Sequence, residues 1–158
     1  MLSAESLSQI DREVSKYPSG CQLSAVMAAL RIAQEEKGWL SSDLIEYVAK
    51  YLKISAISAL EVATFYNMYN LKPTGCNKLT ICTNLPCSLR GSTKIATYLK
   101  HKLGISFGET TPDGKFTLVE GECFGACQEA PVILHNNHKM MCRMEKEKLD
   151  EWLEELSR

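Results

Sequence analysis

Four of the seven cysteines form two closely spaced pairs. Cys82 and Cys87 make a C-x4-C motif, Cys123 and Cys127 make a C-x3-C motif, and residues 88–122 separate the two. Each pair comes where an apolar segment gives way to a loop, so both pairs can converge at one end of a sheet. Thiolates are soft ligands that suit zinc or iron, and four of them complete a ligand set. The spacing therefore predicts a metal centre held by these four cysteines.

The spacing favours a [2Fe–2S] cluster but leaves zinc open. Structural zinc sites accept similar pairs around one tetrahedral ion. A two-iron cluster needs each pair to reach a different iron, which fits the longer loops here. Glycines near the ligands favour the cluster further, because they let backbone N–H groups approach its sulfides. Glycines and prolines surround the ligands at Pro86, Gly91, Gly121, Gly125 and Pro131. A zinc-stapled interaction module remains the alternative.

A thiol–disulfide enzyme would need a C-x-x-C motif or a low-pKa nucleophile with a resolving partner. No cysteine pair in the sequence has that spacing. The remaining cysteines are expected to be free thiols; they are Cys21, Cys76 and Cys142. Of these, Cys76 is the first alternative ligand to consider, because it lies only six residues before Cys82. We therefore expect a binding centre rather than a thiol enzyme.

Catalytic motifs are absent from the sequence, which has neither a G-x-G-x-x-G nor a phosphate-binding G-x-x-x-x-G-K run. His135 and His138 flank a predicted turn and are expected to be solvated, as are the paired acids Glu120 and Glu122. The chain can thus hold an electron but has no site for a hydride donor, which a partner must supply.

The composition is that of an ordinary globular protein, with 158 residues, 45% hydrophobic and 23% charged, and a net charge of −1. This balance points to neither nucleic acid nor an anionic membrane surface. The longest apolar run, at residues 25–30, is too short to span a membrane. The first residues lack a secretory signal, so we expect reducing cytoplasm, where an odd number of cysteines indicates metal ligands and free thiols.

Apolar residues in the first part of the chain recur with a helical period. The expected helices cover residues 7–14, 23–33, 44–52 and 57–69; the second stops at Gly38 and a serine at 41 or 42 caps the third. The last stripe consists of Ile57, Leu60, Phe65 and Tyr69. These segments predict a small antiparallel bundle over residues 1–75, with the stripes as its core.

The period changes after Pro73, and residues 76–158 are predicted to be an α/β domain. We expect a buried strand at 79–81 ending at Cys82, a helix at 95–103 closed by Gly104, and a final helix through 149–156. Two hairpins are predicted, one at Asp113-Gly114 with 116–119 as its return strand, and one between 131–134 and 139–141. The predicted class is α+β, a helical bundle followed by a sheet with packed helices.

Several segments of the sequence resemble those of a known family. They are Tyr17-Pro18, QEEKGWL at 34–40, VATFYNMY at 62–69, TPDGKFTL at 111–118, the C-x4-C pair, and CFGACQEAPV at 123–132. Together they resemble the thioredoxin-like [2Fe–2S] subunit of NADH–quinone oxidoreductase, respiratory complex I. The cysteine pairs joined to the last run are the most specific part. Phe124 stands where leucine is usual in the family.

The resemblance implies a helical bundle followed by a thioredoxin-like ferredoxin domain. It also implies a [2Fe–2S] cluster on Cys82, Cys87, Cys123 and Cys127, close to the flavin of a larger flavoprotein that carries FMN and the NADH site. The chain itself would be an electron carrier in the respiratory chain, in the cytoplasmic peripheral arm of a membrane-bound complex. Similar subunits serve NAD-linked hydrogenases and formate dehydrogenases, which remain alternatives.

Overall fold

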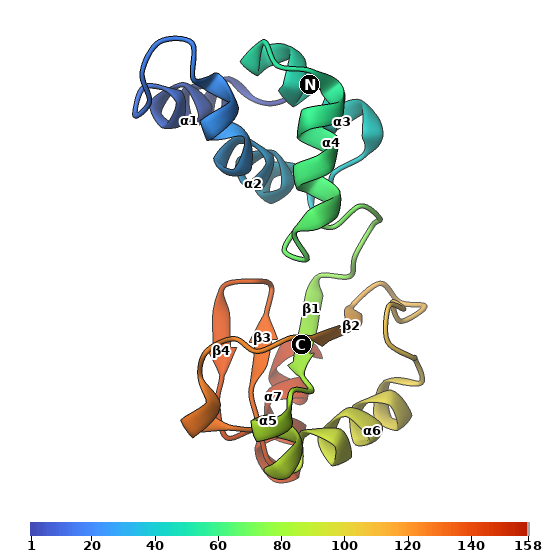
Figure 1. The fold of residues 1–158 in the computed structure, drawn as a ribbon. Coiled ribbons are helices and arrows are strands. Elements are labelled where there is room, and N and C mark those ends of the chain that lie inside the picture. The colour runs from blue at the N-terminus through green and yellow to red at the C-terminus, as the bar shows by residue number, and fades with distance from the viewer. Residues whose placement is uncertain (158) are drawn as a thin grey trace. The chain divides into compact units, whose positions relative to one another are not determined.

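The computed structural model describes residues 1–157 and divides into two compact units, Met1–Pro73 and the chain from Thr74 onward. The first unit is helical and the second contains the sheet (Figure 1). Along residues 1–157, every helix is too short or too polar to cross a membrane.

The helical unit is built from α1 (Ala4–Val14), a 3-10 turn η1 (Gln22–Ala25), α2 (Val26–Lys37), α3 (Ser42–Leu52) and α4 (Ala56–Phe65). Serines begin three of these helices, because the hydroxyls of Ser3, Ser41 and Ser55 each accept a backbone N–H of the first turn. Gly38 ends α2 in the left-handed conformation, at φ +82°, as predicted. Each predicted helix of this region overlaps one in the structure, but α4 ends at Phe65 rather than at residue 69.

The buried face of α4 is not the predicted one. Ala59 and Ala63 face the core, whereas Ile57, Leu60 and Phe65 are 61%, 38% and 77% exposed. Of the predicted stripe only Tyr69, which lies beyond the helix, is buried. Apolar residues lie on more than one side of the helix, so its periodicity cannot select the face that packs. The alanines let α4 approach its neighbours closely, and this leaves the larger side chains outside.

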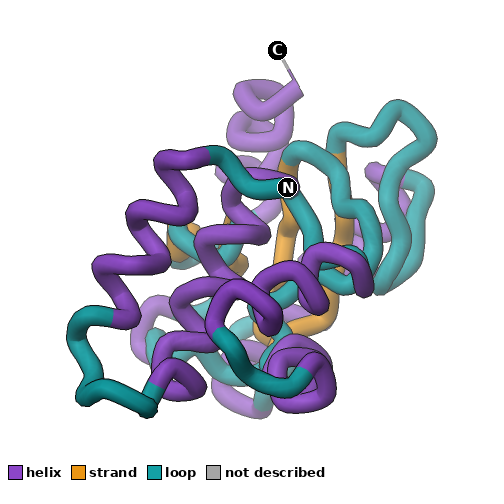
Figure 2. The backbone as a smooth tube through the Cα atoms, turned by 90° about the horizontal axis from the view of Figure 1, so that it is seen from above, coloured by secondary structure: helices purple, strands orange, loops and turns teal. Residues whose placement is uncertain are grey.

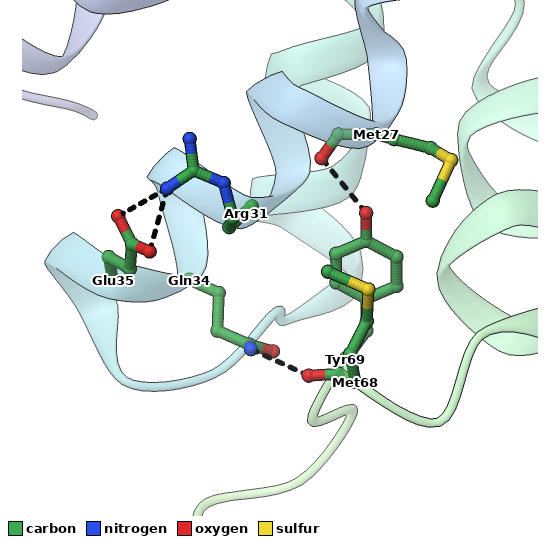
Figure 3. Close-up of polar contacts among 6 residues, drawn as sticks. All are labelled: Met27, Arg31, Gln34, Glu35, Met68 and Tyr69. Atoms are coloured by element: carbon green, nitrogen blue, oxygen red, sulfur yellow. Dashed lines mark hydrogen bonds and ion pairs between the residues drawn. The ribbon is translucent and has the colours of Figure 1, made fainter. Parts of the chain in front are cut away.

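A set of polar contacts holds the turn after α4 against α2 (Figure 3). The Gln34 amide donates to the Met68 carbonyl at 2.9 Å and accepts the Asn70 backbone N–H at 2.5 Å. The Tyr69 hydroxyl donates to the Met27 carbonyl at 2.9 Å. These contacts join the QEEKGWL segment to the end of the VATFYNMY segment, so part of each motif serves to fix this turn.

The second unit contains a four-stranded sheet in the order β2-β1-β3-β4. Its strands are orange in Figure 2. Strands β1 and β2 are parallel, and β1, β3 and β4 pair antiparallel in turn. Its elements are β1 (Asn77–Cys82), α5 (Leu85–Leu89), α6 (Ser92–Leu103), β2 (Phe116–Gly121), a 3-10 turn η2 (Cys127–Glu129), β3 (Ile133–His135), β4 (Lys139–Met141) and α7 (Lys146–Ser157). The predicted α+β class is confirmed.

One of the two predicted hairpins is confirmed, and the other is confirmed as a turn but not as a pair of neighbouring strands. Asn136 and Asn137 take positive φ, +48° and +61°, and connect β3 to β4. At Asp113-Gly114 the chain turns back and makes an isolated antiparallel bridge, from Thr110 to Thr117, with backbone hydrogen bonds from Thr111 to Phe116 and from Leu118 to Glu109. Strand β2 pairs instead in parallel with β1, along its whole length. Local turn signals could not reveal this partner, since α6 separates the two strands in the chain.

The two faces of the sheet have different chemistry. Leu79 and Ile81 of β1 pack with residues of α6 and α7 in the main apolar core. Alternation places Lys78, Thr80 and Cys82 on the opposite face of the strand. Cys82 is thus the last residue of a buried strand, where the main chain leaves the sheet.

Candidate metal centre

Parallel pairing of β1 and β2 brings the two cysteine motifs to the same edge of the sheet. The register matches Cys82 with Gly121, so both strands end together. The first pair begins at the end of β1, and Cys123 follows the end of β2 by two residues. The carboxyl ends of neighbouring parallel strands are a common location for binding sites in open sheets. The predicted convergence of the motifs therefore has a simple topological cause.

The first pair is buried. Cys82 and Cys87 are each 2% exposed and pack with Ala130 and Val132. The backbone N–H of Cys82 donates to the Val132 carbonyl at 3.1 Å. Helix α5 starts inside the C-x4-C loop and carries Cys87 back toward the strand end. The protein thus encloses this half of the candidate site in apolar surroundings.

The second pair is exposed and lies on a tight loop. The Sγ atoms of Cys123 and Cys127 are 3.4 Å apart. The backbone N–H of Gly125 donates to the Cys123 Sγ at 3.4 Å, and Gly125 has φ +77°. A residue with a Cβ would be strained in that conformation. The loop therefore needs glycine to aim a backbone N–H at a ligand sulfur.

Neighbouring groups shift the pKa values of three of these thiols, Cys82, Cys123 and Cys127. The Gly125 N–H, and then the Cys127 thiol, lower the pKa of Cys123. Burial raises the pKa of Cys82, and the neighbouring Cys87 and Cys123 add to this rise. The Cys123 thiol raises the pKa of Cys127, with a smaller contribution from Cys82. These mutual effects link the buried pair to the exposed one, and a bound metal must displace the thiol protons.

The donor set fits a [2Fe–2S] cluster, because two pairs of thiolates can each complete the coordination of one iron. Within residues 1–157, no three His, Cys, Asp or Glu side chains are grouped closely enough to hold a metal ion by themselves. The thiols lie as two pairs, one enclosed and one open to solvent.

The other predicted residues belong to other segments of the chain, and His135 behaves differently from expectation. Cys21 lies in the helical unit, Cys76 is exposed before β1, and Cys142 is half-buried after β4. His135 is not a solvated turn residue. Its Nε2 lies 2.9 Å from the Asn77 Oδ1, and its ring meets Trp152 edge to face at 5.3 Å. Burial lowers the pKa of His135, and only the fold brings these partners together.

Two acids next to the candidate ligands have partners that the sequence does not reveal. Glu120 and Glu122 are exposed, as expected, and they also accept hydrogen bonds from the side chains of Thr83 and Asn84. The Glu-Gly-Glu run just before Cys123 is visible in the sequence, but its partners are not. Their pairing depends on the register of β1 and β2.

Comparison with known proteins identifies relatives of the whole fold. The family model of the thioredoxin-like [2Fe–2S] ferredoxins matches residues 10–157. Over 134 residues the chain is 47% identical to the E subunit of NADH-quinone oxidoreductase from Rickettsia bellii, covering 84% of this chain and 80% of that protein. It is 44% identical over 134 residues to the mitochondrial NADH dehydrogenase [ubiquinone] flavoprotein 2 of Dictyostelium discoideum, covering 84% of this chain and 54% of that protein.

Among solved structures, the chain is similar to part of an NAD+-reducing [NiFe]-hydrogenase in its H2-reduced state. The TM-score is 0.70 at 17% identity, over 81% of this chain. The chain spans only 22% of that hydrogenase chain. This likeness concerns the fold alone.

Proposed function

Because the chain belongs to the family of thioredoxin-like [2Fe–2S] ferredoxins, we propose that it is the electron-transfer subunit of an NADH–quinone oxidoreductase, with one cluster on Cys82, Cys87, Cys123 and Cys127. The observation that carries the ligand assignment is the shared edge of β1 and β2, which gathers both cysteine motifs. The relatives from Rickettsia, which align over most of their own length, support the choice of this complex.

When bound, a [2Fe–2S] cluster accepts and returns one electron at a time. The chain's own residues would determine where that electron can enter. Cys82 and Cys87 hold their half of the site behind Ala130 and Val132, away from water. Cys123 and Cys127 are exposed, so this side of the site is open to a partner. The Gly125 N–H stabilises negative charge on the Cys123 sulfur.

The proposed partner is a flavoprotein subunit that carries FMN and binds NADH. The sequence contains no recognisable nucleotide-binding motif for FMN or for NADH. We propose that this subunit lies in the peripheral arm of the complex, on the cytoplasmic side of the membrane. The chain is proposed neither to insert into the membrane nor to bind nucleic acid. An equivalent subunit of an NAD-linked hydrogenase or formate dehydrogenase is the second candidate. The hydrogenase likeness favours it only at the level of fold.

The face of α4 that carries Ile57, Leu60 and Phe65 supports an assembled state. Leu23 and Met27 of the same unit are also exposed, at 52% and 37%. Large apolar side chains gathered on an exposed surface are typical of interfaces. We therefore assign this face of α4 to the flavoprotein partner.

Single serine substitutions at the proposed ligands test the function. The native chain should have the visible and EPR spectra of a [2Fe–2S] protein, with two irons per chain. Replacing any one of the four ligands, as in Cys123→Ser, should abolish or strongly alter these spectra. The matched control, Cys21→Ser, should leave them unchanged. Unaltered spectra in Cys123→Ser would refute the ligand assignment, and a colourless native protein with stoichiometric zinc would refute the function.

A further inference from the structure

The two ligand loops are joined by hydrogen bonds that involve none of the cysteines. The Thr83 backbone N–H donates to the Gly121 carbonyl at 3.2 Å, extending the β1–β2 ladder by one residue. The Thr83 hydroxyl then donates to Glu120 Oε1 at 2.8 Å. The Asn84 amide donates to Glu122 Oε2 at 2.5 Å. Both side-chain bonds run from the C-x4-C loop to residues that immediately precede the C-x3-C loop.

Asn84 makes this contact instead of capping its own helix. It lies directly before α5 with extended backbone angles, φ −63° and ψ 159°, which is the usual position for an asparagine N-cap. Its side chain makes no cap bond to the helix. An ionised carboxylate only accepts hydrogen bonds, so Glu122 orients the Asn84 amide with its NH2 group toward the other loop. The side chain is thus used between the loops rather than within one of them.

The charges of Glu120 and Glu122 are not cancelled by these partners, since both donors are neutral. Glu129, on the other side of Cys127, is different. It forms an ion pair with Arg143, with contacts of 2.8 and 3.0 Å. Glu122 directly precedes the proposed ligand Cys123 in the chain. Two acids therefore place negative charge beside the exposed cysteine pair.

We propose that Glu120 and Glu122 are positioning residues of the metal centre, which join the two ligand loops through Thr83 and Asn84 and keep the reduction potential of the cluster low through their charge. The inference rests on the proposed cluster. One-electron reduction adds a negative charge to the centre, and nearby carboxylates oppose that addition. Hydrogen bonds between the loops hold the two thiol pairs together in the absence of any covalent link.

Removal of charge without loss of the hydrogen bond tests the electrostatic role. Glu122→Gln keeps an acceptor oxygen for Asn84, and Glu120→Gln keeps one for Thr83. In the full chain, each variant should retain its cluster and shift the potential to more positive values, measured by redox titration of the visible and EPR signals. We expect roughly a tenfold change in the reduction equilibrium, which is about 59 mV for a one-electron couple.

Glu155→Gln is the matched control for charge. Glu155 is exposed on the last part of α7. Lys115, just before β2, donates to the Ser157 carbonyl, so this end of α7 lies at the start of β2, away from the ligand edge. The control should leave the potential unchanged. Potentials equal to native in both Glu120→Gln and Glu122→Gln would overturn the electrostatic role.

Removal of the donors without loss of charge tests the positioning role. The double variant Thr83→Val/Asn84→Ala deletes both side-chain donors and keeps both carboxylates. It should lose iron to a chelator about tenfold faster per bond removed, as expected for hydrogen bonds to charged groups. Loss at the native rate would overturn the positioning role. A native chain that lacks the iron–sulfur spectrum would refute the proposed function itself, whereas a native spectrum with unaltered variants would refute only this inference.

Discussion

Gly121, the last residue of β2, has no room for a side chain. A Cβ built there would lie 2.6 Å from Thr80 Cγ2 and 2.7 Å from Phe124 Cζ. Ordinary van der Waals contacts begin at 3.4 Å. In Gly121→Ala, therefore, both neighbours must move by about 0.7–0.8 Å, or the strand end must shift. Overpacking of this kind destabilises a protein by about 1–3 kcal/mol.

Thermal unfolding of the metal-free chain measures this cost. At about 4–8 °C per kcal/mol for a unit of this size, the melting temperature of the sheet unit should fall by roughly 4–24 °C. Phe124 follows Cys123 directly, so its displacement also moves the second ligand loop. We therefore expect slower cluster assembly from iron and sulfide in the same variant.

A compensating variant separates this explanation from a general effect of substitution. Thr80→Ser removes the Cγ2 atom, and Phe124→Leu removes the ring atoms that the added methyl group would meet. Combined with Gly121→Ala, the two changes should restore much of the lost stability, because both close contacts disappear. The packing argument would be refuted if Gly121→Ala had the melting temperature of the native protein, or if the triple variant regained none of the lost stability.

Four further predictions concern other parts of the chain. Tyr69→Phe should lower stability by about 1 kcal/mol near neutral pH, because the Met27 carbonyl loses its donor. Burial raises the pKa of Tyr69 to about 12, so the native chain should lose stability between pH 10 and 12 as the unfolded state releases this proton, and the variant should lose less. Burial lowers the pKa of His135, so this side chain contributes to stability above about pH 6.5 and the contribution is lost as the pH falls further. In urea titrations, His135→Gln should therefore lose less stability on acidification than the native chain or His138→Gln. A fragment starting at Thr74 should assemble the cluster but bind the flavoprotein weakly in pull-down assays, and full-strength binding would move the interface to the sheet unit. The isolated chain should not oxidise NADH, and measurable turnover without flavin would reveal a missed site.

Local signals in the sequence determined those elements whose cause lies within a few residues. Gly38 and Gly104 end α2 and α6 because each takes a left-handed conformation that closes the helix. Asn136 and Asn137 allow the tight turn between β3 and β4 for the same reason. The cysteine motifs were likewise identifiable from residue type and spacing, since chelating pairs are local features. Their role as cluster ligands remains a prediction.

Only the tertiary structure decided which partners distant residues would meet. Apolar residues lie on more than one side of α4, so packing with its neighbours, not its period, buried Ala59 and Ala63 and left Phe65 exposed. Strand β2 took β1 as its parallel partner across α6, and the turn at residue 113 could not indicate this. The same pairing brought Glu120 and Glu122 within hydrogen-bond distance of Thr83 and Asn84. These choices depend on contacts between segments far apart in the chain, whose energies no local pattern contains.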